Sequence, residues 1–322
     1  MTSEATHALP PGESETAVPT EVGDLGAVLR VPSECAPLPG VVMVDGAGDG
    51  DRYDWGSLPA RIADAGSIVL RHDKPGCGGS PGHWTNQSFH DRARESLAAV
   101  AALREHPATA GQPVGLYGIS QGGWVALLAA VLDPDAVDFV ISHSGPGTTP
   151  AQQERERIRN WLRVEGHTAE EVDEAMAWVD LRAEHICSEI PVADIIAEQE
   201  NYAERPWYAT TTFGYDSVNR LQFGRRVLDF DPTKVMPEIT CPVLALFGGA
   251  DTSVSAQASL HAFAEHLPPN PNHHGFAVFP GADHGLYISD PDPEAPDTLA
   301  PAYLPTLTAF LADRRRGVAR SA

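Results

Sequence analysis

The pentapeptide Gly118-Ile119-Ser120-Gln121-Gly122 places a serine where an apolar run ends and a run with helical spacing begins. Glycines on both sides leave room for a strained turn that exposes the serine hydroxyl, because larger side chains would clash with the neighbouring strand and helix. A hydroxyl is a weak nucleophile near neutral pH, so it needs a base within hydrogen-bond reach and an acid to orient that base. The pattern therefore predicts a nucleophilic Ser120 with two partners.

The order of residues along the chain indicates those partners. In a strand-turn-helix setting of this kind the acid and then the base follow the serine. Asp251 comes after the apolar run VLALF and a Gly-Gly turn, and His284 lies in FPGADHG, just past another apolar run. Both residues would stand at the carboxyl ends of strands, so we predict a triad of Ser120, Asp251 and His284.

Rival residues are less well placed. His273 and His274 precede the last apolar run and should lie at the opposite end of the sheet. Asp283 and Asp290 are too close in sequence to the predicted base to act as its separately held acid. His143 follows a strand at the correct end, so it remains a candidate for the wall of a substrate pocket.

Attack on a carbonyl creates an oxyanion, which two preorganised backbone N–H groups can stabilise. One donor is expected from Gln121, directly after the nucleophile. The second is expected from the glycine-rich loop Asp45-Gly46-Ala47-Gly48, where we predict Ala47.

Short apolar runs alternate with helical spacing along most of the chain, which is typical of βαβ units on a parallel sheet. The expected strands are 40–44, 67–70, 114–119, 139–142, 243–247 and 276–279, with an antiparallel edge strand at 25–31. The expected helices of the core are 58–65, 91–105, 122–132, 255–267 and 302–315. We therefore predict an α/β fold with a mostly parallel sheet of roughly eight strands flanked by helices, and a flexible segment over the first twenty or so residues.

The alternation stops in the middle of the chain, where no strand-like run appears. Residues 151–165, 170–185, 192–203 and 215–228 have helical spacing instead. We predict that residues 148–233 form an inserted helical cap, and that residues 1–147 and 234–322 form the two parts of the core. Aromatic residues of the cap are candidates for an apolar pocket lining, together with Trp124 behind the nucleophile: Trp161, Trp178, Tyr202, Trp207, Tyr208, Phe213 and Tyr215.

Composition narrows the possible partners. Acidic residues number 44 against 22 basic ones, giving a formal net charge of −22. Such a charge repels phosphate backbones and anionic lipid headgroups, so we expect neither nucleic acid nor a membrane as a partner. The chain starts without a secretory signal pattern and lacks an apolar run of about 20 residues, so we expect a cytoplasmic monomer or homodimer. Cys35, Cys77, Cys187 and Cys241 are scattered and are expected to be reduced thiols, with no metal site.

At this point two further segments add a family resemblance. VDGAGDGDRYDW and VLRHDKPGCGGSPG resemble the HGxGxxDR oxyanion loop and the later RxDxRGxGxS turn of α/β-hydrolases, in particular a serine-hydrolase subgroup related to dienelactone-hydrolase-like and acyl esterases. The resemblance covers nearly the whole chain. It implies Ala47 as an oxyanion donor, the triad already named, and a helical cap after the sixth core strand.

The chain departs from that pattern at two positions. Asp45 stands where the family usually has His, and Pro75 stands where the later turn usually has Arg. An ionised carboxylate facing an oxyanion would oppose catalysis, so we expect Asp45 to turn away and pair with Arg52 or Arg71. The alternative is that Asp45 contacts the substrate and marks a specialised reaction.

Three functional hypotheses follow. The leading one is hydrolysis of a carboxylic ester or thioester of a small to medium apolar substrate through an acyl-enzyme on Ser120, a route that needs no metal or organic cofactor. The second keeps the fold but eliminates an acyl or acetate group, or transfers the acyl group to an alcohol, on a natural-product ester. The third is a non-catalytic binding protein of the same fold.

Overall fold

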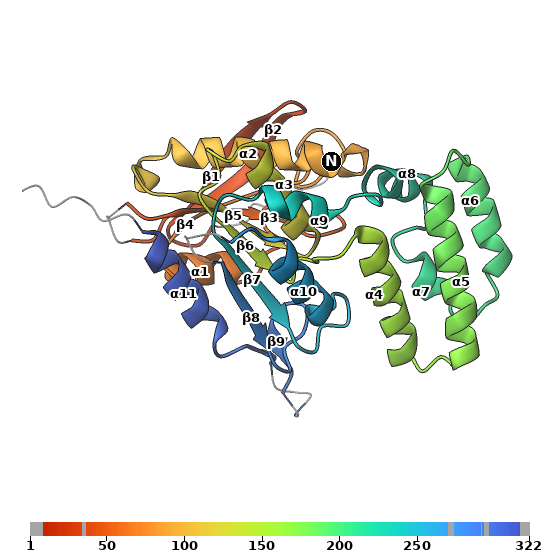
Figure 1. Ribbon diagram of the computed structural model, residues 1–322. Coiled ribbons are helices and arrows are strands. Elements are labelled where there is room, and N and C mark those ends of the chain that lie inside the picture. Colours follow the sequence, from red (N-terminus) through yellow and green to blue (C-terminus); the bar gives the residue numbers. More distant parts are fainter. Residues whose placement is uncertain (1–8, 34–36, 270–273, 291, 293–295, 316–322) are drawn as a thin grey trace, which may run out of the picture.

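The computed structural model describes residues 9–33, 37–269, 274–290, 292 and 296–315. One sheet runs through it in the order β1-β2-β4-β3-β5-β6-β7-β8 (Figure 1). From β4 to β8 all neighbouring strands are parallel, whereas β2 is antiparallel to both β4 and β1. The strands are β1 (Glu13–Thr20), β2 (Gly23–Arg30), β3 (Gly40–Val44), β4 (Ile68–His72), β5 (Val114–Ile119), β6 (Val140–His143), β7 (Val243–Gly248) and β8 (Gly275–Phe279). A separate antiparallel pair joins β9 (Tyr287–Ile288) to β10 (Thr298–Leu299).

The edge of the sheet differs from the sequence prediction. The segment around Leu25 is not the edge strand, because β1 pairs outside it along eight residues, Glu13 to Thr20. These residues were expected to be flexible, since ESETAVPT is polar and contains proline. Only Val18 of this strand is buried, and such a composition is usual at a sheet edge, where charge opposes pairing with another chain. The Glu13 carboxylate also fastens β1 to the sheet through ion pairs with Arg30 and Arg71.

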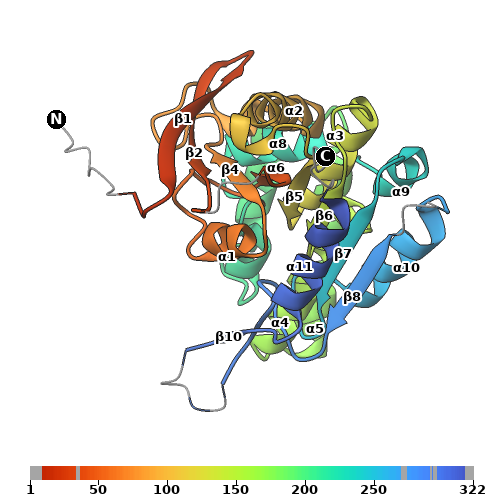
Figure 2. The ribbon, with the colours of Figure 1, turned by 90° about the vertical axis from the view of Figure 1, so that its left-hand side faces the viewer.

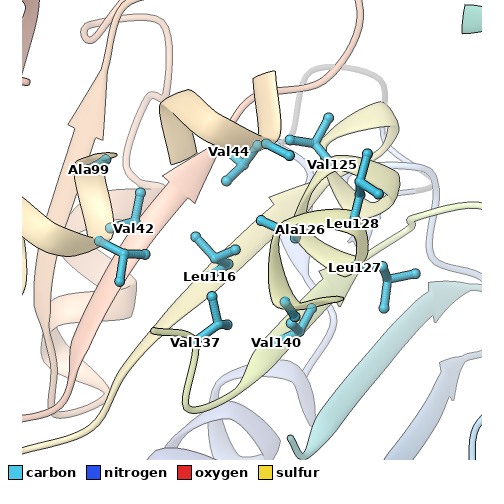
Figure 3. Close-up of a cluster of buried hydrophobic side chains, with 14 of the residues drawn as sticks. Val42, Val44, Ala99, Leu116, Val125, Ala126, Leu127, Leu128, Val137 and Val140 are labelled. Carbon is cyan, nitrogen blue, oxygen red and sulfur yellow. The ribbon is translucent and has the colours of Figure 1, made fainter. Parts of the chain in front are cut away.

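Helices cover both faces of the sheet. Figure 2 shows α1 (Leu58–Asp64) and α11 (Tyr303–Arg314) on one side, and α2 (Phe89–Arg104), α3 (Gln121–Leu132) and α10 (Ala256–His266) on the other. The helix α3 is apolar around its whole circumference because it is enclosed on every side. Its side chains Val125 and Leu128 pack near Val44 and Leu116 of the sheet (Figure 3). Each such burial contributes about 1.5–3 kcal/mol, which fixes α3 and the turn before it.

The stretch between β6 and β7 is helical, as expected. It contains α4 (Pro150–Val164), α5 (Ala169–Ile186), α6 (Val192–Gln199), α7 (Tyr208–Thr212), α8 (Val218–Val227) and α9 (Pro232–Val235). The helices α4 to α8 lie beside the sheet rather than on either face of it (Figure 1). Capping boxes begin α4 at Thr149 and α5 at Thr168. The short helices α7 and α9 were not expected from the sequence.

Two further predictions from the sequence concerned the cysteines and membrane-spanning segments. Cys77, Cys187 and Cys241 are free thiols, as expected, while Cys35 lies outside the described residues. None of the helices in the described parts of the chain combines the length and the apolar character that a bilayer span requires.

Candidate active site

Ser120 occupies a strained turn between β5 and α3. Its backbone has φ 52° and ψ −122°, a region that costs a non-glycine residue about 1–3 kcal/mol. The flanking glycines make this turn possible: a Cβ on Gly118 would lie 2.2 Å from the carbonyl oxygen of Gly122, and one on Gly122 would lie 2.2 Å from that of Val44. The Ser120 N–H donates to the carbonyl of His143 on the adjacent strand at 2.8 Å. The sheet therefore holds the serine in its strained conformation.

Asp251 and His284 meet at the same end of the sheet, on the loops after β7 and β8. The His284 Nδ1 and the Asp251 Oδ2 are 2.7 Å apart. The Asp251 side chain is only 1% exposed, and its other oxygen accepts from the backbone N–H groups of Ser253 and Val254 at 2.7 and 3.0 Å. Because these two donors fix the carboxylate, it can in turn fix the plane and the tautomer of the imidazole.

The loop after β3 lies beside Ser120 and His284. The structure records no acceptor among the described residues for the N–H of Ala47 on this loop, or for that of Gln121 at the first position of α3. Both residues line the same cavity as Ser120 and His284. Two free N–H groups beside a serine form an arrangement that can stabilise negative charge on a substrate oxygen.

Asp45 does not have either of its predicted partners. Arg52 pairs with Asp73 and Arg71 pairs with Glu13, whereas the Asp45 carboxylate lies 3.0 Å from Lys74 Nζ. Lys74 directly precedes Pro75, so the sequence did contain a cation close to the altered turn. Burial and the charge of Arg92 lower the pKa of Lys74 to about 8, and Asp45 partly offsets this shift.

The cavity over Ser120 has a volume of about 440 Å³. Ser120, Gln121, Ala47 and His284 line it from the side of the sheet. Its other walls come from α4, the 213–216 segment and α8, together with Trp84 of the 84–86 turn and Trp124 of α3. These walls are rich in apolar and aromatic groups: Trp84, Trp124, Trp161, Phe213, Tyr215, Phe223, Val227 and Leu228. The volume lies within the range of ordinary small-molecule sites.

Comparison with known proteins identifies the family. Residues 39–292 match the family described as serine aminopeptidase, S33. The chain belongs to this family of α/β-hydrolases. No curated protein sequence matches the chain.

Solved α/β-hydrolases share the fold at low sequence identity. A dienelactone hydrolase from Anabaena variabilis is 17% identical with a TM-score of 0.54, the alignment covering 94% of this chain and 98% of that one. An esterase of Pyrococcus furiosus is 15% identical with a TM-score of 0.61, over 94% and 91% of the two chains. A 2,6-dihydroxy-pseudo-oxynicotine hydrolase is 17% identical with a TM-score of 0.56, over 86% of this hydrolase but only 63% of the other chain.

Several residues expected in the pocket of this hydrolase lie elsewhere. Of Asp45, Trp124, His143, Trp207 and Tyr208, only Trp124 is on the cavity wall, and Asp45 faces Lys74 instead. Trp207 is buried among the cap helices and donates to Glu174, and Tyr208 donates to Glu200 at the surface. Both residues were pocket candidates by composition, but Trp207 packs the interior of the helical insert and Tyr208 lies near its surface. Of the other cap aromatics, Trp161, Phe213 and Tyr215 reach the cavity, whereas Trp178 and Tyr202 do not.

His143 is likewise not a pocket residue. It is 1% exposed, and its Nδ1 contacts the hydroxyl of Tyr117. Burial lowers its pKa to about 3, so it stays neutral near pH 7. His274 lies at the amino end of β7, where its Nδ1 accepts from the Val243 N–H, and His273 is outside the described residues.

A charged pair on the cavity wall was not predicted from the sequence. Arg157 donates to both carboxylate oxygens of Glu154 at 2.6 and 2.7 Å, and its guanidinium lies 4.2 Å from the centre of the Trp161 ring. The side chains are only 10% and 14% exposed. Their spacing of three residues was the available signal, but in the polar run QQERERIRN it looks like an ordinary solvated helix face.

Proposed function

We propose that this hydrolase cleaves a carboxylic ester or thioester of a small to medium apolar substrate through an acyl-enzyme on Ser120. The observation that carries the proposal is the 2.7 Å contact between His284 and Asp251 beside a cavity that Ser120 also lines. Under this proposal Asp251 orients His284, and Ala47 and Gln121 provide the oxyanion hole.

The proposed reaction has two steps. His284 removes the Ser120 proton as the hydroxyl oxygen attacks the substrate carbonyl, and the N–H groups of Ala47 and Gln121 stabilise the oxyanion. The tetrahedral intermediate collapses as His284 donates the proton to the leaving alcohol or thiol. Water, deprotonated by His284, then attacks the acyl-enzyme and releases the acid, which restores Ser120.

The walls of the cavity support the substrate class. Aromatic and aliphatic groups dominate the side opposite Ser120. Of the charged lining groups, Glu154 and Arg157 pair with each other and Arg220 lies over the Trp84 ring, and Asp216 also lines the cavity. An apolar acyl or alcohol group would lose water-exposed surface against the aromatic and aliphatic part of this wall. We propose that the helices α4 to α8 act as a cap that provides this apolar wall.

Kinetics with p-nitrophenyl esters of increasing acyl length, and with matched thioesters, test the proposal. Ser120→Ala should lower kcat by at least about 10³-fold. Ser57→Ala makes the same chemical change at an exposed position and should retain full activity. Retention of most turnover by Ser120→Ala, or failure of a fluorophosphonate to label Ser120 in the parent protein, would contradict the acyl-enzyme route. Amino-acid p-nitroanilides form a separate arm, because the family description names an aminopeptidase.

The elimination and acyl-transfer hypotheses rested on a contact between Asp45 and the substrate and on the large cap. Asp45 is paired with Lys74 and is not among the cavity-lining residues, which removes the first reason for preferring them. Product analysis in ¹⁸O-labelled water separates the reactions. Hydrolysis places one solvent oxygen in the released acid, whereas elimination gives an unsaturated product and transfer gives a new ester.

A further inference from the structure

Lys74 makes three polar contacts with the loop after β3, around Ala47. Its Nζ donates to the carbonyl oxygen of Gly46 at 2.7 Å and to that of Gly48 at 2.6 Å, and it lies 3.0 Å from the Asp45 carboxylate. The lysine side chain is 4% exposed. Burying a cation costs free energy unless its N–H groups have hydrogen-bond partners. The contacts of Lys74 with the loop after β3 supply these partners and stabilise the buried charge.

The contact with Gly46 bears directly on the Ala47 N–H, because the two groups belong to one peptide unit. In a planar trans peptide the C=O and the N–H point in opposite directions. A charged donor on the Gly46 oxygen therefore fixes the orientation of the Ala47 N–H and polarises it toward greater positive charge. Both changes favour the binding of an anionic oxygen by that N–H.

Neighbouring contacts occupy the other polar groups around the Gly46–Ala47 peptide and leave the Ala47 N–H available. The Gly46 N–H is taken by the Asp45 Oδ1 at 2.7 Å. Arg92, a second buried cation, donates to the Asp45 carbonyl at 2.6 Å and to the side-chain oxygen of Gln121 at 2.7 Å. The loop and the residue after the nucleophile are thus held from behind by Lys74 and Arg92.

We propose that Lys74 is a positioning residue for the oxyanion hole, acting through the Gly46–Ala47 peptide without touching the substrate. The inference rests on the proposed acyl-enzyme function. It also assigns a role to Asp45: the carboxylate holds Lys74 over the loop and occupies the Gly46 N–H.

Protonation of Lys74 gives this role a pH dependence. The charged or titratable groups that act on it are Asp45 on the loop after β3, Arg92 and Glu95 on α2, and Cys77 on the turn that follows Lys74. Burial and Arg92 bring its pKa to about 8, so the charge on Nζ is lost as the pH rises through that value. The activity should therefore fall on the alkaline side of about pH 8.

The test compares Lys74→Met with two controls, using an ester that the parent protein hydrolyses. Lys74→Met should lower kcat by about 10- to 100-fold while KM changes by less than about threefold, because the oxyanion forms only during reaction. A trifluoromethyl ketone, which forms a tetrahedral adduct with a serine, should bind more weakly by a similar factor. Asp45→Asn removes the ion pair but leaves both carbonyl contacts, and should lower kcat by only about threefold. Lys234→Met makes the same change at an exposed site, and its kcat should equal that of the parent.

The outcomes separate this inference from the proposed function. If the parent neither turns over esters nor labels at Ser120, the proposed function fails. If the parent is active, then equal kcat values in Lys74→Met and the parent overturn the positioning role alone. An effect of Asp45→Asn as large as that of Lys74→Met also overturns it, because the ion pair and not the carbonyl contacts would then matter.

If Lys74→Met does not fold, Lys74→Arg provides the decisive measurement. Arginine keeps the positive charge at every accessible pH, so the alkaline fall in kcat should move to higher pH. A limb that stays near pH 8 in this variant would overturn the proposal.

Discussion

Replacement of Asp251 by asparagine changes one oxygen to an amide nitrogen, and the surrounding contacts determine how the new side chain lies. The backbone N–H groups of Ser253 and Val254 donate to Oδ1, so the amide oxygen must stay on that side. The amide NH₂ then faces Nδ1 of His284 in place of the acceptor that stood 2.7 Å away. A neutral imidazole can accept this new bond only by carrying its proton on Nε2, which prevents it from taking the Ser120 proton.

The expected fall in kcat follows from this change of tautomer. Choosing the opposite orientation of the amide would set its NH₂ against two buried N–H donors, at a cost of about 1–3 kcal/mol for each unsatisfied donor. The opposite orientation would restore the acceptor for Nδ1–H, but this cost keeps its population low, so the base is lost in most molecules. We expect kcat for ester hydrolysis to fall by about 10³- to 10⁴-fold at pH 7, a loss comparable to that known for such a change in serine proteases.

Steady-state kinetics on the same p-nitrophenyl ester provide the assay, with circular dichroism to verify folding. Asp290→Asn is the matched control, since it makes the same change at an exposed aspartate beyond β9, and it should keep the parent kcat. A folded Asp251→Asn protein with more than about one tenth of the parent kcat would refute the reasoning, because the base would then not depend on that carboxylate.

Three further predictions concern stability. Gly122→Ala should lower the free energy of unfolding by about 2–3 kcal/mol in urea titrations, since its Cβ would lie 2.2 Å from the Val44 carbonyl oxygen, and an unchanged midpoint would mean that the turn can open. Burial raises the pKa of Glu95 from 4.5 to about 7, so the folded state holds a proton that the unfolded state releases, and stability should fall as the pH rises from about 4.5 to 7. Glu95→Gln should remove up to about 3 kcal/mol of that fall, and identical pH–stability curves would argue against a neutral Glu95. Glu154→Ala should destabilise the protein by about 3 kcal/mol because it leaves Arg157 buried without its partner, whereas the double variant with Arg157→Met should recover part of the loss; a double variant less stable than the single one would contradict this.

Most of the sheet could be predicted because its strands are buried on both faces. Continuous runs such as GVVMV and VLALF have no polar face, and the turn residues after them mark the carboxyl ends of the strands. The placement of Asp251 and His284 near each other followed from the same rule, since parallel strands bring their carboxyl ends to one edge. Strand β1 escaped prediction because an edge strand with only Val18 buried carries almost no hydrophobic pattern.

Contacts between side chains were harder to predict than the positions of helices and strands. Asp45 was predicted to pair with Arg52 or Arg71, but its partner is set by which turn packs against the loop. Glu154 and Arg157 have the spacing of an exposed helix pair, and only the position of α4 over the cavity gives them a different role. Such assignments depend on how distant elements pack together, which one-dimensional patterns do not specify.

The cavity draws its two sides from separate parts of the chain. The residues proposed to react stand on loops at the carboxyl ends of the sheet strands, while the opposite wall belongs to α4, the 213–216 segment and α8. Exchange of Phe213 or Val227 would therefore reshape what the enzyme accepts without moving the atoms that perform the chemistry. Substrate preference in this protein can be redesigned, or can diverge among descendants, while the reaction itself is conserved.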